Sequence, residues 1–112
     1  MGRLPDQRLA TLGKTVKVVG DVISSEDLRV DGDLEGKIEA PDHIVTVGSE
    51  GFVRANIKAR IVVLQGKLLG NVEASEKMEI RKDAHLEGDV RTPSIVVEDG
   101  AYFKGGIDIV RP

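Results

Sequence analysis

The chain has 112 residues, a formal net charge of −3 and no cysteine. The acidic balance argues against binding to nucleic-acid phosphates, and an aromatic content of 3% provides no stacking platform for single strands. The lack of cysteine excludes disulfides and thiolate chemistry and fits a reducing compartment. No apolar run approaches the ~18 residues that span a bilayer, so we expect a single intracellular domain.

Residues 1–12 lie outside the pattern that fills the rest of the chain. Pro5 disfavours regular structure there, and the segment lacks the apolar core of a signal peptide. We therefore expect a short flexible N-terminal tail over 1–12, followed by one folded domain over 13–110.

A repeat of about 17 residues runs through that domain. Each copy has the pattern apolar-x-small-x-apolar-x-small, and a less regular first copy lies at 18–24. The later copies are 34–40, 53–59, 68–74, 86–92 and 103–109. A fixed period of this length, combined with strand-like alternation, is typical of a stacked β-solenoid.

Each coil contains further strand segments, separated by turns rich in glycine and acidic residues. A second apolar column begins these segments at Leu28, Val45, Val62, Met78 and Ile95. We therefore expect three short strands per coil, one on each face of a triangular tube. The small residues Gly36, Ala55, Gly70, Gly88 and Gly105 are expected to point inward, at a corner that admits no larger side chain.

The spacing between copies varies from 15 to 19 residues. A left-handed hexapeptide helix requires a strict count of six per side, so this variation disfavours it. Because parallel crossovers favour the right hand, the sequence predicts an all-β, right-handed parallel β-helix of about six coils.

One outward column alternates in charge from coil to coil. Its members are Glu39, Lys58, Glu73, Arg91 and Asp108. In a parallel stack these residues would lie about 4.8 Å apart, where opposite charges contribute about 0.2–1 kcal/mol per pair. Such a column would disfavour a slip of one coil in register.

We find no constellation that predicts catalysis, a cofactor or a metal site. His43 and His85 fall in different columns. Gly13-Lys14-Thr15 lacks the earlier glycine of a phosphate-binding loop, because that position is Arg8. A polysaccharide-acting enzyme needs clustered acids on one face, whereas Lys58 and Arg91 interrupt the acidic column. We therefore expect no enzyme activity and no bound nucleotide.

The ends of the tube are the most informative candidate sites. Terminal coils leave backbone donors and acceptors unpaired and expose one side of the core, and solenoids normally cap such ends. Here the pattern continues to the end of the chain, which invites end-to-end pairing with another copy. The candidate residues at the C-terminal end are Phe103, Tyr102, Ile107 and Ile109. Those at the N-terminal end are Val16, Val18 and Val22.

The repeats resemble those of the bactofilin family. The resemblance rests on residues 20–38, 70–74 and 86–90 and extends over about 13–110. It implies a bacterial cytoskeletal protein with a right-handed β-helix, which polymerises without nucleotide into non-polar filaments involved in cell shape or envelope organisation.

The resemblance also implies a cytoplasmic, cytoskeletal location at the inner face of the cell membrane, with cell-wall enzymes among the partners. Many members attach to the membrane through a short apolar N-terminal motif. This chain departs from that motif, because Leu4, Leu9 and Leu12 are scattered among charged residues. The departure argues against attachment of this kind.

A second hypothesis is a non-polymeric β-helical module that binds a protein or carbohydrate on a side face. The outward apolar residues Val63, Val96 and Leu69 could form such a patch, or a lateral contact between filaments.

Overall fold

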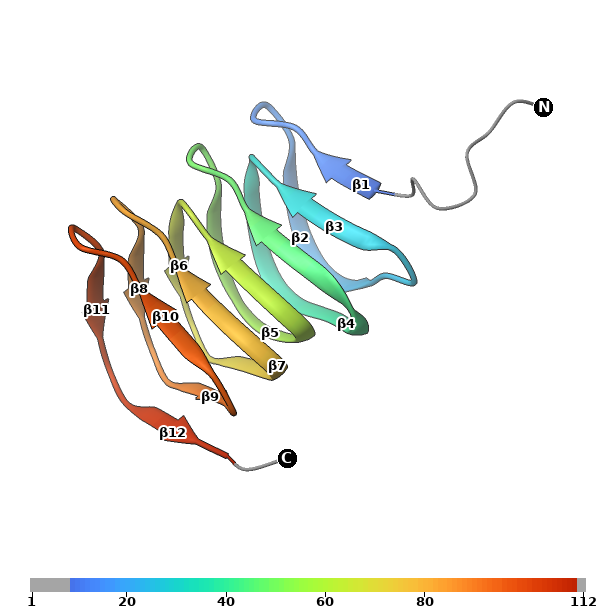
Figure 1. The fold of residues 1–112 in the computed structure, drawn as a ribbon. Coiled ribbons are helices and arrows are strands. Elements are labelled where there is room, and N and C mark those ends of the chain that lie inside the picture. Colours follow the sequence, from blue (N-terminus) through green and yellow to red (C-terminus); the bar gives the residue numbers. More distant parts are fainter. Residues whose placement is uncertain (1–8, 111–112) are drawn as a thin grey trace.

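The computed structural model describes residues 9–110, and every regular element in that range is a β-strand (Figure 1). The strands are β1 (Leu9–Leu12), β2 (Lys17–Ile23), β3 (Asp27–Val30), β4 (Asp33–Val47), β5 (Phe52–Leu64), β6 (Lys67–Leu69), β7 (Val72–Ile80), β8 (His85–Glu87), β9 (Val90–Thr92), β10 (Ile95–Val97), β11 (Tyr102–Lys104) and β12 (Ile107–Ile109). They stack into a β-solenoid of about six turns, which confirms the predicted fold class.

The coil has three faces. Face A consists of 17–19, 33–35, 52–54, β6, β8 and β11; face B of 21–23, 37–40, 56–59, 72–74, β9 and β12; and face C of β1, β3, 44–47, 61–64, 77–80 and β10. All strand pairs in the described range are parallel.

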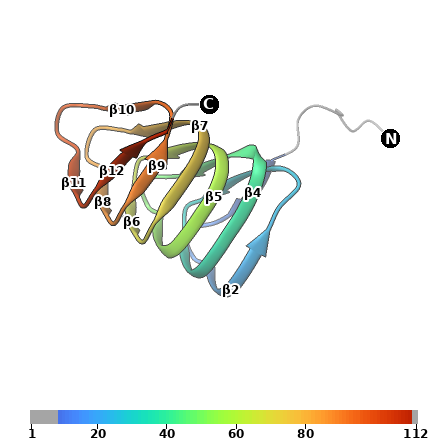
Figure 2. The same cartoon turned by 90° about the horizontal axis from the view of Figure 1, so that it is seen from below.

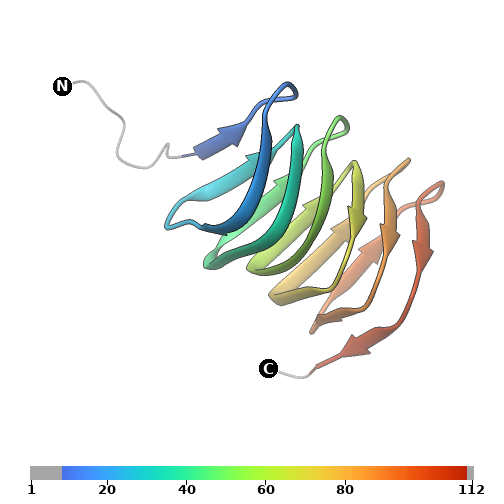
Figure 3. The same cartoon turned by 180° about the vertical axis from the view of Figure 1, so that it is seen from behind.

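The hand of the coil can be followed in two views. In Figure 1 the face-C strands run upward in front as the chain advances from right to left. Figure 3 shows from behind that the face-A strands run downward. The coil is therefore right-handed, as expected for parallel crossovers, and Figure 2 shows the turns stacked along one axis.

The core is a continuous apolar column inside the tube. Inward positions repeat in register from coil to coil, as in the series Leu34, Val53, Leu68, Leu86 and Phe103. Alternation is clearest in β5, where buried and exposed residues follow one another over most of the strand. Thr92 is the buried polar residue of the described range, and its hydroxyl donates to the Ser94 carbonyl at 3.0 Å.

The expectation of inward small residues is confirmed for Ala55, which is 5% exposed in the core, but it is wrong for the glycines. Gly36 is exposed, and Gly36, Gly70, Gly88 and Gly105 have φ between +137° and +145°. A Cβ atom on Gly36 would overlap the Gly20 carbonyl oxygen of the preceding coil. These positions need glycine because of backbone conformation and close approach between coils, not because the interior lacks space.

The solenoid begins inside the segment expected to be a tail. Strand β1 pairs in parallel with β3, with Ala10 beside Leu28 and Leu12 beside Val30. Ala10 and Leu12 pack against the core, which is why this segment joins the sheet. The expected boundary between residues 12 and 13 is therefore too late. The rest of the expected tail, 1–8, lies outside the described residues.

Candidate functional site

Both ends of the solenoid carry strands that pair on one side only. At the N-terminal end β1 pairs with β3 and β2 with β4; at the C-terminal end β10, β11 and β12 pair with β7, β8 and β9. An edge of this kind presents a row of backbone donors and acceptors that another strand can use. Within residues 9–110, the two ends are thus open to further strand pairing.

At the C-terminal end the apolar core reaches the surface. Val90 is 1% exposed, whereas Ile107, its register partner in the last coil, is 47% exposed. Ile109 is 54% exposed, and the half-buried Phe103 packs against the core beside Leu86. Three of the four residues predicted for this end therefore belong to one apolar surface.

Tyr102 lies at the outer rim of the same coil. It is half exposed on face A, in register with His85. All four residues predicted for the C-terminal end thus lie in β11 and β12. Phe103, Ile107 and Ile109 are on the inner side, whereas Tyr102 is on the outer side.

The residues predicted for the N-terminal end lie in the first described coil. Val18 and Val22 are partly buried against the core, beside Leu34 and Ile38. Val16 precedes β2 in a turn and is exposed, and its backbone N–H donates to the Gly13 carbonyl at 2.9 Å.

Sequence reasoning missed two residues at this end. Val19 and Ile23 point outward from β2 and are 71% and 79% exposed. They head columns in which the next residues are Glu35 and Glu39. Their signal in the sequence is a break in the outward polar pattern, visible once the columns are aligned.

The predicted side patch is not contiguous. Val63 and Val96 share a column on face C, but Glu79 lies between them. The Glu79 carboxylate binds Lys77 at 3.0 Å and Arg81 at 2.8 Å, which makes the centre of this column polar. Leu69 lies on face A, away from both valines.

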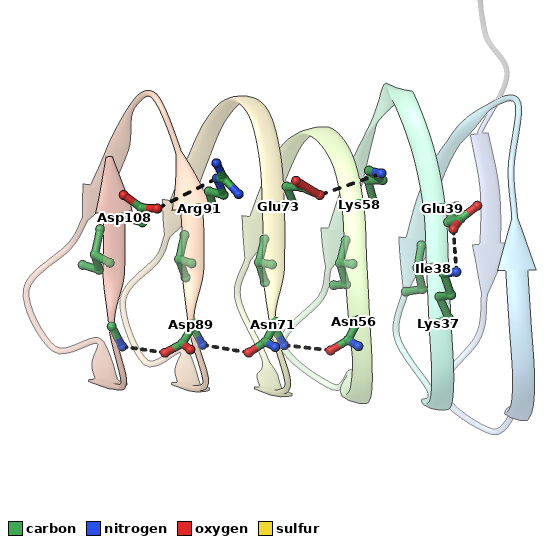
Figure 4. A pocket seen from close by; sticks show the side chains of 15 residues that line it. Lys37, Ile38, Glu39, Asn56, Lys58, Asn71, Glu73, Asp89, Arg91 and Asp108 are labelled. Atoms are coloured by element: carbon green, nitrogen blue, oxygen red, sulfur yellow. Dashed lines mark hydrogen bonds and ion pairs between the residues drawn. The ribbon is translucent and has the colours of Figure 1, made fainter. Parts of the chain in front are cut away.

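Face B carries a groove of about 620 Å³ that runs along the solenoid. Its backbone floor lies between two rows of outward side chains (Figure 4). One row is the predicted charge column, and the strand register places its members side by side. Lys58–Glu73 and Arg91–Asp108 are 3.9 Å ion pairs. Glu39 instead binds Lys37 of its own strand at 2.8 Å.

The second row of the groove is a ladder of short polar side chains. The Oδ1 atoms of Asn56 and Asn71 accept hydrogen bonds from the backbone N–H groups of Asn71 and Asp89, both at 3.1 Å. Asp89 Oδ1 accepts from the Gly106 N–H at 3.0 Å. Each side chain therefore ties its own coil to the following one, and Gly106 ends the ladder because it has no side chain.

The histidines serve separate local contacts. His43 Nδ1 lies 3.5 Å from Asp27 Oδ1, and His85 Nε2 lies 2.7 Å from Glu87 Oε2. The hydrogen bond from His85 lowers the pKa of Glu87 below its ordinary 4.5. No group of three metal-ligating side chains converges anywhere in residues 9–110.

The comparisons with known proteins match this architecture. A family model described as bactofilin, polymer-forming cytoskeletal, matches residues 10–108. The chain belongs to the bactofilin family. The match begins within β1, in agreement with the start of the solenoid.

Three curated bactofilins of Myxococcus xanthus are similar to this chain, each over 98 residues or 88% of it. BacO is 36% identical, with 77% of its own length covered. BacN is 36% identical over 86% of its length, and BacP is 31% identical over 40% of its length. No significant match to a solved structure was found.

Membership of the bactofilin family places this chain among the polymer-forming cytoskeletal proteins. In the face-B groove, Lys58 and Arg91 lie beside Glu73 in the register, so cations interrupt the acidic column. The part of the bactofilin chain that the structure describes has no helix able to span a bilayer.

Proposed function

We propose that this bactofilin is a scaffold subunit that polymerises end to end, without nucleotide, into non-polar filaments. The observation that most directly supports this proposal is the open apolar core at the C-terminal end. There Ile107 and Ile109 are about half exposed although they occupy inward positions. Covering such surface contributes about 25 cal/mol per Å². A second copy that pairs with the strand edge would cover it and would bind the free backbone groups as well.

The chemistry of the two rims favours joining like end to like end. On face A the outward column that begins at Val19 ends at Lys104, and on face B the column that begins at Ile23 ends at Asp108. Stacking C-terminal end on N-terminal end in register would place a charge beside an apolar side chain in both columns. Isologous contacts avoid that mismatch and give a filament without polarity.

The cellular setting of the proposal follows from the family. A polymer-forming cytoskeletal family supports self-association as the primary interaction. We propose a filament in the cytoplasm that organises cell shape or the envelope together with cell-wall enzymes, without the N-terminal membrane motif of other family members. Support from individual residues is confined to self-association through the ends, because the side patch of Val63, Val96 and Leu69 is divided.

The test replaces Phe103 with arginine. A charge buried at a junction is costly unless it is paired, so Phe103→Arg should limit assembly to small oligomers, whereas the wild type forms filaments. Phe103→Leu is the matched control, because leucine already occupies this column at Leu86 and keeps the contact apolar. Negative-stain electron microscopy of the three proteins is the measurement. Filaments of normal length from Phe103→Arg would contradict the proposed C-terminal junction.

A further inference from the structure

The first coil has an outward surface unlike that of any later coil in the described chain. Val19 and Ile23 project from β2 with 71% and 79% of their surfaces exposed. The following residues in the Val19 column are Glu35, Arg54, Leu69, Glu87 and Lys104; those in the Ile23 column are Glu39, Lys58, Glu73, Arg91 and Asp108. Two outward columns that are otherwise almost entirely charged, one on face A and one on face B, thus both begin with a large aliphatic side chain, and the column that begins at Asp21 lies between them.

Strand β2 consequently carries apolar residues on both sides at an open edge, with Lys17 and Asp21 as the charged residues of its outer side. Its inward residues Val18 and Val22 pack on the core, and Val19 and Ile23 occupy the outer side. Side chains of paired strands that lie on the same face are neighbours at about 4.5–5.5 Å. A strand that pairs with this edge would therefore meet apolar groups on both its inner and its outer face.

We propose that Val19 and Ile23 form an outward apolar contact with the N-terminal coil of a second copy of this chain. The inference rests on the proposed end-to-end assembly and adds to it the residues that match one N-terminal end with another. The C-terminal end is a poorer occupant, because its rim carries Lys104 and Asp108 in these two columns. In an N-to-N junction, Val19 and Ile23 of the two copies would contact one another. This outer contact would add to the inner contact made by Val18 and Val22.

An anionic lipid surface is the competing occupant, and the charges around the pair disfavour it. Val19 lies beside Glu35 and Ile23 beside Glu39 on the same outer faces. Asp21 lies between them in the strand, with its side chain exposed. These three carboxylates outnumber the two lysines on the same outer faces, Lys17 and Lys37. The negative surface potential of such a membrane would therefore repel this surface on balance.

The experiment isolates the N-terminal junction in the full chain. In the Phe103→Arg background, a filament joined like end to like end reduces to dimers held by their N-terminal ends, with twice the 12.1 kDa mass of the chain. Adding Val19→Lys and Ile23→Lys should convert these dimers to monomers. Each new lysine lies beside Glu35 or Glu39 in the register, so opposite charges keep the coil itself stable.

The matched control is the pair Val63→Lys and Leu69→Lys in the same background. It removes two aliphatic side chains and adds the same charge at outward positions of central coils, and it should leave the dimer intact. A milder pair, Val19→Thr and Ile23→Thr, retains β-branched strand formers and should raise the dimer dissociation constant at least tenfold. Sedimentation equilibrium gives the masses and constants, and circular dichroism verifies the fold.

The possible outcomes distinguish failure of the N-to-N contact from failure of the proposed filament. A wild-type chain that stays monomeric at high concentration overturns the proposed filament. Filaments from the wild type but monomers from Phe103→Arg would mean head-to-tail joining, which overturns the N-to-N contact and the lack of filament polarity but leaves end-to-end assembly standing. Folded lysine and threonine variants that remain dimers overturn the N-to-N contact too. So does a loss of co-sedimentation with phosphatidylglycerol vesicles that leaves the dimer unchanged, because the pair would then be a lipid contact.

Discussion

The phenol ring of Tyr102 lies parallel to the imidazole ring of His85, with 4.4 Å between the ring centroids and 10° between the planes. The two residues are register partners on the outside of face A. The other edge of the imidazole contacts Glu87 Oε2 through Nε2 at 2.7 Å. The last coil is thus held on the outside by an aromatic stack and on the inside by Phe103.

Replacing Tyr102 with alanine should release the outer half of this attachment. Stacked aromatic pairs contribute about 0.5–1.5 kcal/mol beyond their buried area, so Tyr102→Ala should lower the free energy of unfolding by roughly 1 kcal/mol. Tyr102→Phe keeps the ring and should stay within a few tenths of wild type. Urea denaturation at one protein concentration measures both, since assembly makes stability depend on concentration. Equal losses in the two variants would show that the hydroxyl, not the stack, carries the effect.

Replacing Gly88 with alanine should destabilise the coil far more than its size suggests. Gly88 has φ +145°, and an added Cβ would overlap the Gly70 carbonyl oxygen. Strained backbone of this kind costs about 1–3 kcal/mol, and the overlap adds to it, so a loss of ~3 kcal/mol or more is expected. Ala55 occupies the same column without positive φ, and Ala55→Gly should cost only ~1 kcal/mol. Thermal denaturation of the two variants tests this order.

The sequence was sufficient to predict the stack, its period and its inward columns. Residues such as Leu34 and Leu68 alternate with polar neighbours at a fixed spacing, and burial of the alternate set follows directly. The reason for the glycines could not be read in the same way. A glycine required by a crowded interior and a glycine required by a positive φ look the same in the sequence. Only the backbone conformation in the structure distinguishes the two reasons.

The candidate ends were predictable only in part. The sequence predicts Ile107 at an interface because it continues an inward column, and within residues 9–110 no further coil covers it. Val19 and Ile23 were missed because they are outward residues, and their significance appears only when register places them beside Glu35 and Glu39. Strand β1 was missed because the second apolar column, which marks the face-C strands from Leu28 onward, has the small residue Ala10 at this position of the first coil.

The ion pair between Lys37 and Glu39 should make stability depend on pH at both extremes. The hydrogen bond from Lys37, 2.8 Å away, holds the pKa of Glu39 below its ordinary 4.5, and Glu39 raises the pKa of Lys37 above 10.5. The Glu39 contribution is therefore present above about pH 4.5 and disappears as pH falls through the lowered value. The Lys37 contribution is present below pH 10.5 and disappears as pH rises through the raised value.

Lys37→Met should remove both effects and return the pKa of Glu39 toward its ordinary value. Lys58→Met is the control: its charge acts on Glu39 only as the weakest of the contributing causes, so it should shift the carboxyl titration much less. NMR titration of the Glu39 side-chain carboxyl carbon gives the pKa in each protein. A larger shift from Lys58→Met than from Lys37→Met would contradict the order of these two partners.

The attachment of Gly106 to Asp89 predicts where the solenoid first opens. Gly106 has no side chain and lies in the last coil, and its N–H is bound by Asp89 Oδ1 at 3.0 Å. Its carbonyl accepts from the Val90 N–H at 2.9 Å, so this short segment is tied to the preceding coil from both sides. Asp89→Ala removes one hydrogen bond, worth about 1 kcal/mol for an exposed group, and should accelerate exchange of the Gly106 amide roughly fivefold.

The matched control is Asp89→Asn, which keeps an Oδ1 acceptor, as Asn56 and Asn71 do in the preceding coils, and should leave exchange nearly unchanged. Hydrogen exchange followed by NMR in the Phe103→Arg background measures the effect, because a C-terminal junction would otherwise protect this coil. If both substitutions accelerate exchange alike, the charge of Asp89 rather than its hydrogen bond holds the last coil in place.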